Sequence, residues 1–280
     1  MSSSRIKTIA IAALVLINVF FLTFIIIDTL DDVLTEREMM ENVCAVLRAG
    51  GIELSPDDVK TSGAIRTMRT GRVLEAEEII AYAMLGPTTK TDQGIIYLYE
   101  NNSRGSAEFA SAGDFEIRLY EGVITNENGT MRTVEGLLRE MRIEWAGMTV
   151  TLDAESETET VSVLGAFRDV KIFNCTIGFY FAGGSLQTVS GRFVAGIELA
   201  DDGVAITHVS RALLGFLSEV RREEREDVIA EIIYSVEPGY RHRVVGSFGE
   251  GLLSPSWLLA TDAGRYIVDD ASGEVLALGQ

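Results

Sequence analysis

The sequence predicts an α+β protein: a single N-terminal transmembrane helix followed by two units, each an antiparallel sheet backed by helices. Two kinds of pattern predict the units, the alternation of apolar and polar residues at 171–181 and the helical apolar stripe at 209–220. An apolar run from Ile9 to Ile27 predicts the anchor. The expected domains are a cytoplasmic tip and anchor at 1–33, a first unit at 34–145 and a second unit at 146–280.

The apolar run is long enough to cross a membrane. As a helix it would measure about 28 Å, close to the thickness of the hydrocarbon core of a bilayer. It is longer than the apolar region of a signal peptide, and no small-residue cleavage site follows it. Arg5 and Lys7 precede the run, and only acidic residues follow it closely. We therefore expect a single-pass protein of the cell membrane with a cytoplasmic N-terminus and an extracytoplasmic body.

Asn18 lies near the middle of this run, where an unpaired amide is costly. It shares one helical face with apolar residues, namely Leu14, Val15, Phe21, Leu22 and Ile25. One interpretation is a hydrogen bond to the transmembrane helix of a partner, with Asn18, Leu14, Phe21 and Leu22 as the contact face. The other is an amide tolerated in a very apolar helix and bonded to its own backbone.

The composition is strongly acidic, with a formal net charge of −18. Such a surface repels nucleic acid and anionic lipid, so we exclude nucleic acid as a partner. The chain has two cysteines. Cys44 belongs to a helical apolar pattern and Cys175 to the apolar face of a strand, so both are predicted to be small core residues. An interdomain disulfide is the alternative for an exported protein.

The first unit begins with an amphipathic helix at 35–49, closed by Gly50-Gly51. Ser55-Pro56-Asp57-Asp58 has the composition of a helix start. A strand at 64–69 and a helix at 75–85 follow. Three extended segments separated by turn signals then predict an antiparallel meander, at 94–100, 106–110 and 114–120.

A helix at 131–143 leads into the second unit. Its clearest strand places on one face Phe173, Cys175, Ile177, Phe179 and Phe181. After it we expect a strand at 186–197, the helix at 209–220, an alternating segment at 228–236, and strands at 256–261, 265–269 and 274–278. Because a helix followed by a meander recurs, the two halves are candidates for distant structural repeats.

The chain offers little for catalysis. His208 and His242 are its two histidines, and no further ligands stand at metal-binding spacing beside them. His208 is interpreted as a surface or capping residue. The glycine-rich segment 246–251 lacks the helix and lysine of a phosphate loop and is predicted to be a flexible loop. The acidic run at 153–159 is predicted to be a solvated loop or strand edge. We expect no enzymatic activity, no cofactor and no metal site.

One basic patch stands out on this acidic chain. Arg241-His242-Arg243, beside Tyr240, is predicted to lie on a loop between extended segments, where binding residues are common. As a functional site it would contact an acidic or anionic partner. The alternative is a solvated strand end.

Several segments, taken in order, resemble the YycI/YycH family of regulatory proteins of the Gram-positive cell-wall two-component system. They are Lys7-Thr8-Ile9 with Leu16 to Leu22, the strand Ile172 to Phe181, the ending Leu253-Ser254-Pro255-Ser256-Trp257, Thr261 to Asp269, and Gly273-Glu274. PepSY-type domains have a similar ending. The chain departs from the family pattern at Lys171 and at Asp269-Asp270, and residues 50–165 match only in pattern.

The resemblance implies a protein that is not an enzyme. It would associate with a membrane sensor histidine kinase through its transmembrane helix and exported body and modulate that kinase, with a YycH-like paralogue as a further partner. Asn18 is the family-matching residue with a physical role in that contact. The alternative function is a PepSY-like module that binds or inhibits a cell-envelope peptidase or hydrolase. That alternative is motivated by the pattern around Trp257 and Tyr266. The other interpretation of Trp257 is a core aromatic residue.

Overall fold

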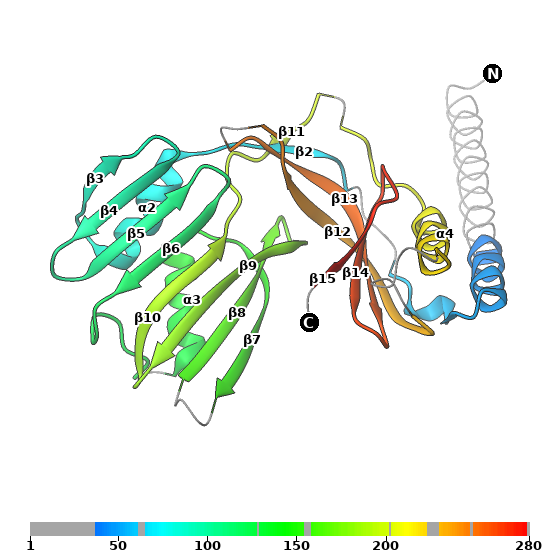
Figure 1. The fold of residues 1–280 in the computed structure, drawn as a ribbon, viewed down its shortest axis with the longest axis horizontal. Coiled ribbons are helices and arrows are strands. Elements are labelled where there is room, and N and C mark those ends of the chain that lie inside the picture. Colours follow the sequence, from blue (N-terminus) through cyan, green and yellow to red (C-terminus); the bar gives the residue numbers. More distant parts are fainter. Residues whose placement is uncertain are drawn as a thin grey trace, which may run out of the picture.

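The computed structural model describes residues 37–60, 65–127, 129–153, 158–201, 203–222, 230–246 and 249–278. The expected transmembrane segment, with Leu14, Asn18, Phe21 and Leu22, lies outside these ranges. Across the described ranges, no helix is long and apolar enough to cross a membrane. The fold is mixed α+β, with one large mixed sheet and, in the described part, four helices (Figure 1).

The structure has two lobes, which lie beside one another along the long axis of the molecule (Figure 1). The central lobe is one continuous stretch, residues 74–193. The terminal lobe combines both ends of the described chain, residues 37–60 and 206–278, around one apolar cluster. The cores therefore do not divide at residue 145, where the sequence placed a boundary. Ile117 and Phe179, on either side of that position, share the core of the central lobe.

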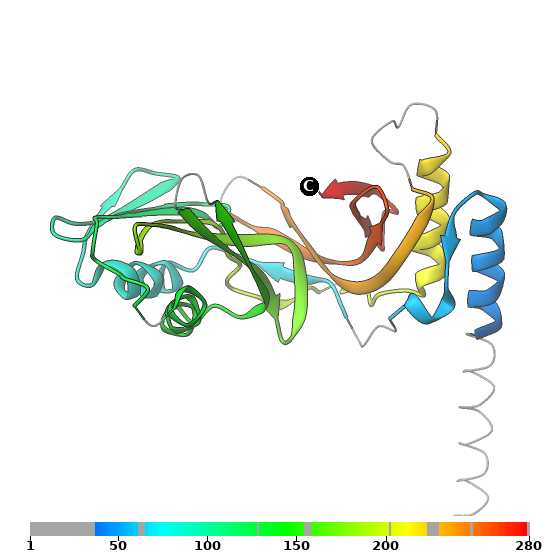
Figure 2. The ribbon, with the colours of Figure 1, turned by 90° about the horizontal axis from the view of Figure 1, so that it is seen from below.

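The central lobe is an antiparallel sheet with both of its helices on one face (Figure 2). The helices are α2 (Leu74–Leu85) and α3 (Thr130–Glu140). In spatial order the strands are β7 (Trp145–Asp153), β8 (Thr158–Phe167), β9 (Val170–Ala182), β10 (Ser185–Arg192), β6 (Asp114–Leu119), β5 (Gly105–Ala110), β4 (Ile96–Asn101) and β3 (Thr89–Asp92). Strands β4 to β6 confirm the predicted meander.

Strand β9 confirms the predicted alternation. All five predicted residues are buried: Phe173, Cys175, Ile177, Phe179 and Phe181. A two-residue turn joins β8 to β9, and its residues Arg168 and Asp169 both have positive φ, 49° and 65°. This backbone matches the right-handed twist of the flanking strands. Ile177, Phe179 and Phe181 of this strand lie in the core of the central lobe, whereas Phe173 packs with Leu258 and Ile267 of the terminal lobe.

The terminal lobe is built on a long ribbon of β12 (Ile232–Val244) and β13 (Gly251–Thr261). The ribbon is extended by β14 (Arg265–Asp269), β15 (Val275–Leu278), β1 (Glu53–Leu54), β2 (Met68–Thr70) and β11 (Glu198–Leu199). The predicted segments 228–236 and 256–261 are shorter than the observed strands β12 and β13. The ribbon is longer because it also crosses charged and glycine-rich residues that carry no alternation.

Two helices pack against each other and against this ribbon. They are the helix at 37–49 and α4 (Val209–Val220), which lie side by side in Figure 2. The first ends as predicted, because Gly51 has φ 87° and the amide of Ile52 donates to the carbonyl of Leu47 at 3.0 Å. The predicted helix start at Ser55 is wrong, since Pro56–Asp58 form only a 3-10 turn.

Both cysteines are free and buried, in different clusters, which confirms them as core residues. Sequence reasoning missed three strands of the central lobe, β3, β7 and β8, as well as the short strands β1 and β11. Residues 145–153 are partly or fully exposed along their length, so they carry no buried face for a period-two pattern to reveal.

Candidate functional site

A groove follows the helices of the central lobe. Its deeper part is a hollow of about 420 Å³ between α2, the end of α3, strands β8 to β10 and residues 193–197. A second, more open hollow of about 700 Å³ lies along α2 and the end of α3. Glu75, Ile79 and Arg142 line both hollows. We call the two together the α2–α3 groove.

The floor of the deeper hollow is apolar. It is lined by aliphatic and aromatic side chains that include Ile79, Ile80, Ile143, Phe167, Ile172, Phe193, Val194 and Ile197. Cys175 also belongs to this lining, and burial raises the pKa of its thiol to about 12. The thiol therefore stays protonated at neutral pH and is unreactive. The floor is suited to binding apolar groups.

Arg142 has a strained backbone at the point where the two hollows meet. Its φ is 57°, in the left-handed region. It occupies the position after the C-cap of α3: its amide donates to the Arg139 carbonyl at 3.2 Å, and the amide of Ile143 donates to the Leu138 carbonyl at 3.0 Å. Glycine is the usual residue here, because a Cβ atom in this conformation costs about 1–2 kcal/mol. An exposed arginine in this place is a candidate functional residue.

The rim of the groove is acidic. Glu75, Glu78, Glu140 and Glu144 line the groove, together with two cations, Arg142 and Arg192, of which Arg192 is paired with Asp114 at 2.8 Å. Lys90 offsets part of this charge through an ion pair of 3.0 Å with Glu78. The rim therefore favours a ligand that carries basic groups beside an apolar stretch.

The start of α2, which forms one wall of the groove, is held by a buried ion pair. The Arg72 guanidinium donates to both carboxylate oxygens of Glu77, at 2.6 and 3.1 Å, and to the Phe109 carbonyl at 3.0 Å. It also lies 4.4 Å from the centre of the Tyr97 ring. These contacts tie the first turn of α2 to β4 and β5, which fixes the position of the wall.

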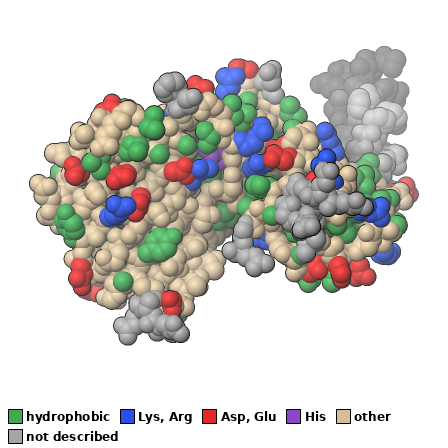
Figure 3. Space-filling view, in the orientation of Figure 1, with side chains coloured by type: hydrophobic (Ala, Val, Ile, Leu, Met, Phe, Trp, Pro, Cys, Tyr) green, Lys and Arg blue, Asp and Glu red, His purple; other side chains and the backbone are tan. Residues whose placement is uncertain are grey.

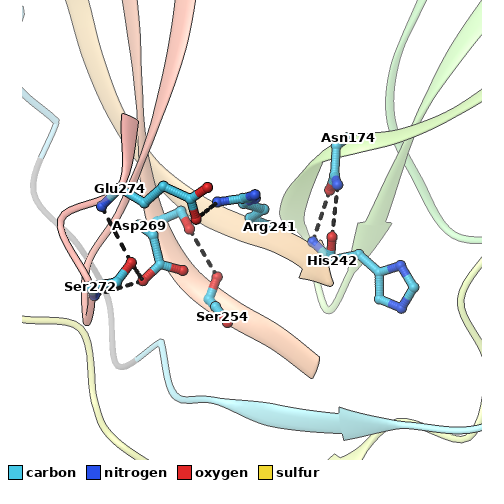
Figure 4. Close-up of polar contacts among 8 residues, drawn as sticks. Asn174, Arg241, His242, Ser254, Asp269, Ser272 and Glu274 are labelled. Carbon is cyan, nitrogen blue, oxygen red and sulfur yellow. Dashed lines mark hydrogen bonds and ion pairs between the residues drawn. The ribbon is translucent and has the colours of Figure 1, made fainter. Parts of the chain in front are cut away.

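The predicted basic patch is not on a loop. Arg241, His242 and Arg243 lie inside β12, paired with β13. Arg241 makes an ion pair of 2.8 Å with Glu274, and its side chain is only 12% exposed (Figure 4). His242 is 5% exposed and hydrogen-bonds through Nε2 to the Thr70 hydroxyl at 3.2 Å. The three residues therefore do not form one exposed basic surface, and Figure 3 shows basic and acidic side chains next to one another on this face.

Burial also sets the protonation of His242. It lowers the pKa of the imidazole to about 4, and the positive charge of Arg192 acts in the same direction. His242 is therefore neutral at physiological pH and belongs to the interior. The Nδ1 atom is buried without a hydrogen-bond partner among the described residues.

Asn174 joins the two lobes beside His242. Its side-chain amide donates to the His242 carbonyl at 2.8 Å and accepts from the His242 amide at 2.8 Å (Figure 4). The backbones of β9 and β12 pair only at Ile172 and Tyr240, so this side chain replaces a missing step of the ladder. The predicted alternation implies that Asn174 lies on the opposite face from Phe173 and Cys175, but nothing in the sequence indicated this partner.

A second polar cluster holds the C-terminal strands. The Asp270 carboxylate is 3% exposed and accepts from Trp257 Nε1 at 3.1 Å and from the amide and hydroxyl of Thr207, both at 2.8 Å. Asp269 accepts from the amide and hydroxyl of Ser272 (Figure 4). Trp257 and Tyr266 lie in the core of the terminal lobe, so the interpretation of Trp257 as a core aromatic is confirmed.

The remaining sequence candidates have structural roles. His208 is the N-cap of α4 and accepts a hydrogen bond from the Ser210 amide at 3.2 Å, as predicted for a capping residue. Residues 245–250 connect β12 to β13, and Gly251, the last residue of the predicted loop, already belongs to β13. Residues 247 and 248 lie outside the described ranges. Within the described ranges, no group of three or more His, Cys, Asp or Glu residues is arranged to hold a metal ion.

Comparison with known proteins supports the fold alone. No family model matches the chain, and no curated protein matches it. The structure is similar to the crystal structure, at 1.45 Å resolution, of an uncharacterized protein from Eubacterium rectale ATCC 33656. The TM-score is 0.50 at 9% sequence identity, over 81% of this chain and 92% of the other. The class that fold and site define is thus a mixed α+β protein with an apolar groove.

Proposed function

We propose that the chain is a membrane-anchored extracytoplasmic regulatory protein of the YycI/YycH type, which binds and modulates a sensor histidine kinase of a cell-envelope two-component system. The observation that carries the proposal is the α2–α3 groove, an apolar hollow with a strained arginine at its centre. The apolar run at 9–27 would keep this groove near the membrane, within reach of the kinase's exported domain.

The proposed occupant of the groove is an apolar segment of the kinase's extracytoplasmic domain, flanked by basic side chains. Ile80, Phe193 and the other floor residues would contact its apolar groups. Acidic rim residues such as Glu75 would pair with its basic groups, and the guanidinium of Arg142 would donate to its backbone carbonyls. In this proposal Asn18 and its neighbours supply a second contact inside the membrane, and a YycH-like paralogue is a further partner.

The finer architecture is part of the same proposal. The two lobes would correspond to the YycI/PepSY-like arrangement of sheet-and-helix units that follows a transmembrane anchor. The mixed α+β fold is consistent with that arrangement, and its lobes are assembled from different stretches than 34–145 and 146–280.

The alternative, a PepSY-like module that binds a peptidase or hydrolase, was motivated by Trp257 and Tyr266. Both side chains are buried, at 2% and 3% exposure. Neither can contact an enzyme while the terminal core is intact, so these two residues do not support the alternative.

The test places a charge in the groove. Ile79→Glu adds a carboxylate where the two hollows meet, and Ile95→Glu adds the same group at an exposed position that lines neither hollow. The full chain is reconstituted with the candidate kinase in lipid nanodiscs, and affinity and kinase autophosphorylation are measured. We expect Ile79→Glu to weaken binding by about tenfold or more and to remove the effect on the kinase.

The control Ile95→Glu should behave as the wild type. Equal binding by both variants would reject the groove as the contact surface. Asn18→Leu, measured separately in the same nanodiscs, reports on the transmembrane contact alone, because it leaves the groove unchanged.

A further inference from the structure

The central sheet has an open face on the side opposite its two helices. Both α2 and α3 lie on one side of the sheet, and the other side is left uncovered (Figure 2). Figure 3 shows this second side, which carries few charged side chains over β7 to β10. We call it the outer face of the central sheet. Its side chains are those that alternate with buried core residues such as Val161 and Phe179.

Hydroxyl side chains form two parallel rows across the outer face. The pairing register of five neighbouring strands, β7, β8, β9, β10 and β6, defines both rows. The first row is Thr151, Thr160, Tyr180, Thr188 and Arg118. The second row is Thr149, Ser162, Gly178, Ser190 and Glu116. Because strands lie about 4.8 Å apart and same-face residues about 7 Å apart along a strand, the rows cover roughly 19 by 7 Å, an elongated area.

Tyr180, at the centre of the first row, lies along the surface of the sheet. A Cβ atom added to Gly178 would stand 2.7 Å from the Tyr180 hydroxyl and 2.9 Å from its Cζ atom. The ring therefore extends along β9 and covers Gly178 in the second row, whereas most strand side chains stand perpendicular to their sheet. Tyr180 is still 43% exposed. An accessible aromatic ring that lies on a polar surface offers a place for another ring to stack.

The charges within the two rows cancel. The two ionised members, Glu116 and Arg118, pair with each other through hydrogen bonds of 2.8 and 3.0 Å. A chain of net charge −18 repels an anionic ligand. A cationic ligand would be drawn instead to the acidic rim of the α2–α3 groove, on the other side of the sheet. The outer face therefore favours an uncharged ligand.

The side-chain chemistry of the rows narrows the choice among uncharged ligands. A hydroxyl group both donates and accepts hydrogen bonds, so the rows match a ligand whose own polar groups do both. The core of a protein interface is apolar and rich in aromatic residues, and these rows hold one aromatic side chain. A chain of sugar rings fits better, because each ring has hydroxyls at its rim and C–H groups on a face that stacks on an aromatic ring.

We propose that the outer face, from β7 to β6, binds a neutral polysaccharide. One sugar ring stacks on Tyr180, and the hydroxyls of Thr160 and Thr188, the cross-strand neighbours of Tyr180, bond to the sugar hydroxyls on either side. The elongated shape of the rows suits several sugar units in line. This site lies across the sheet from the α2–α3 groove, so both can be occupied at once.

A glycan array tests the class of ligand. The full chain in mild detergent is applied to immobilised neutral oligosaccharides of hexoses and of N-acetylhexosamines, with oligosaccharides of uronic acids as the anionic comparison. We expect saturable binding to at least one neutral series, unchanged at high salt because no charge is involved, and none to the anionic series. Absence of binding to every neutral series, or a preference for the anionic one, would overturn the proposal.

Variants then test the place of binding, by calorimetry with the neutral oligosaccharide that binds best. Tyr180→Ala removes the ring, whereas Gly178→Ala keeps the ring and every hydroxyl but displaces the ring from the sheet. We expect each to weaken binding by about tenfold or more. Tyr234→Ala, which removes another exposed tyrosine from the terminal lobe, is the control and should bind as the wild type does.

Near-ultraviolet circular dichroism confirms that each variant is folded before its affinity is compared. Unchanged affinity in folded Tyr180→Ala or Gly178→Ala, or an equal loss in Tyr234→Ala, would reject the outer face as the binding site. The assay contains no kinase, so its outcome does not depend on the proposed function.

Discussion

The central lobe is folded from one continuous stretch, residues 74–193, whereas the terminal lobe forms only when residues 37–60 meet residues 206–278. In the central lobe two helices cover one face of an antiparallel sheet and leave the α2–α3 groove between them and the sheet. The terminal lobe encloses its core and places the Asp270 carboxylate inside it. The central lobe thus contains an open groove, whereas the terminal lobe brings the two ends of the described chain together.

Assembly of the terminal lobe costs more conformational entropy than assembly of the central lobe. Contacts within the central lobe close short loops, but every contact between the two parts of the terminal lobe must close a loop that contains the whole central lobe. The terminal lobe offsets this entropy with a large apolar cluster and with buried, fully hydrogen-bonded polar groups such as Asp270. We therefore expect it to be the more sensitive lobe to single polar substitutions.

The largest effect is expected from Asp270→Ala. It would leave Trp257 Nε1 and the amide and hydroxyl of Thr207 without an acceptor inside the core, which should lower the free energy of unfolding of the terminal lobe by about 3–4 kcal/mol. The chain has two tryptophans, one in each lobe, so urea denaturation can be followed by Trp257 fluorescence in a Trp145→Phe background. Asp270→Asn, which keeps a carbonyl oxygen, is the control and should lose less. Equal losses for both variants would contradict the role of the carboxylate.

A smaller effect, also in the terminal lobe, depends on pH. The pKa of His242 is about 4 in the folded protein and about 6.5 when unfolded, so the unfolded state binds more protons between these values. The stabilisation is complete above pH 6.5 and is lost as the pH falls to 4, by about 3 kcal/mol. Urea denaturation across this range should show a flatter pH dependence for His242→Gln than for the wild type. Parallel curves would mean that His242 does not carry this dependence.

The coupling of the lobes is tested at Asn174. Asn174→Ala removes both hydrogen bonds to the His242 backbone and should cost about 2 kcal/mol. Because this side chain bridges β9 and β12, we expect the Trp145 and Trp257 transitions to move apart. Asn101→Ala is the matched control, since its side-chain amide donates to the carbonyls of Leu85 and Pro87 and accepts from the amide and hydroxyl of Ser103, all within the central lobe. If Asn101→Ala separates the transitions equally, Asn174 has no special part in the coupling.

The smallest effect has the opposite sign. Arg142→Gly relieves the left-handed backbone after α3 and should stabilise the central lobe by about 1 kcal/mol. The same change removes the guanidinium from the groove, so the proposed binding to the kinase should weaken while stability rises. Thermal denaturation and the nanodisc binding assay are measured on the same preparation. A variant that binds as well as wild type would show that Arg142 is strained for a reason other than binding.

The elements that the sequence predicted well are those with one buried face. The apolar residues from Phe173 to Phe181 alternate because one face of β9 is buried, first beside the terminal lobe and then in the core of the central lobe. The helix α4 has a complete apolar stripe because it packs on the terminal core. The candidate site was harder to predict. The floor of the groove combines side chains from α2, β8, β9 and residues 193–197, and no local pattern shows that these stretches meet.

Residues Arg241 to Arg243 were wrongly predicted to lie on a loop, again because their structure depends on distant parts of the chain. Three consecutive polar residues look like a loop, but in β12 each has a separate environment: Arg241 pairs with Glu274, and His242 is buried against Thr70. The strand persists because β13 pairs with it along this whole stretch, which is a non-local cause. Likewise, the acidic run after residue 153 concealed the hairpin of β7 and β8, of which residues 154–157 lie outside the described ranges.

The sequence by itself determined the types of the well-patterned elements, the buried state of both cysteines and the core position of Trp257, because these depend on local periodicity and on the transfer of apolar groups out of water. Only the tertiary structure decided that the two ends of the chain share a core, that Asn174 joins the lobes and that Arg142 lies where two hollows meet. These features depend on contacts between residues far apart in the sequence, whose pairing is fixed by the packing of the whole chain.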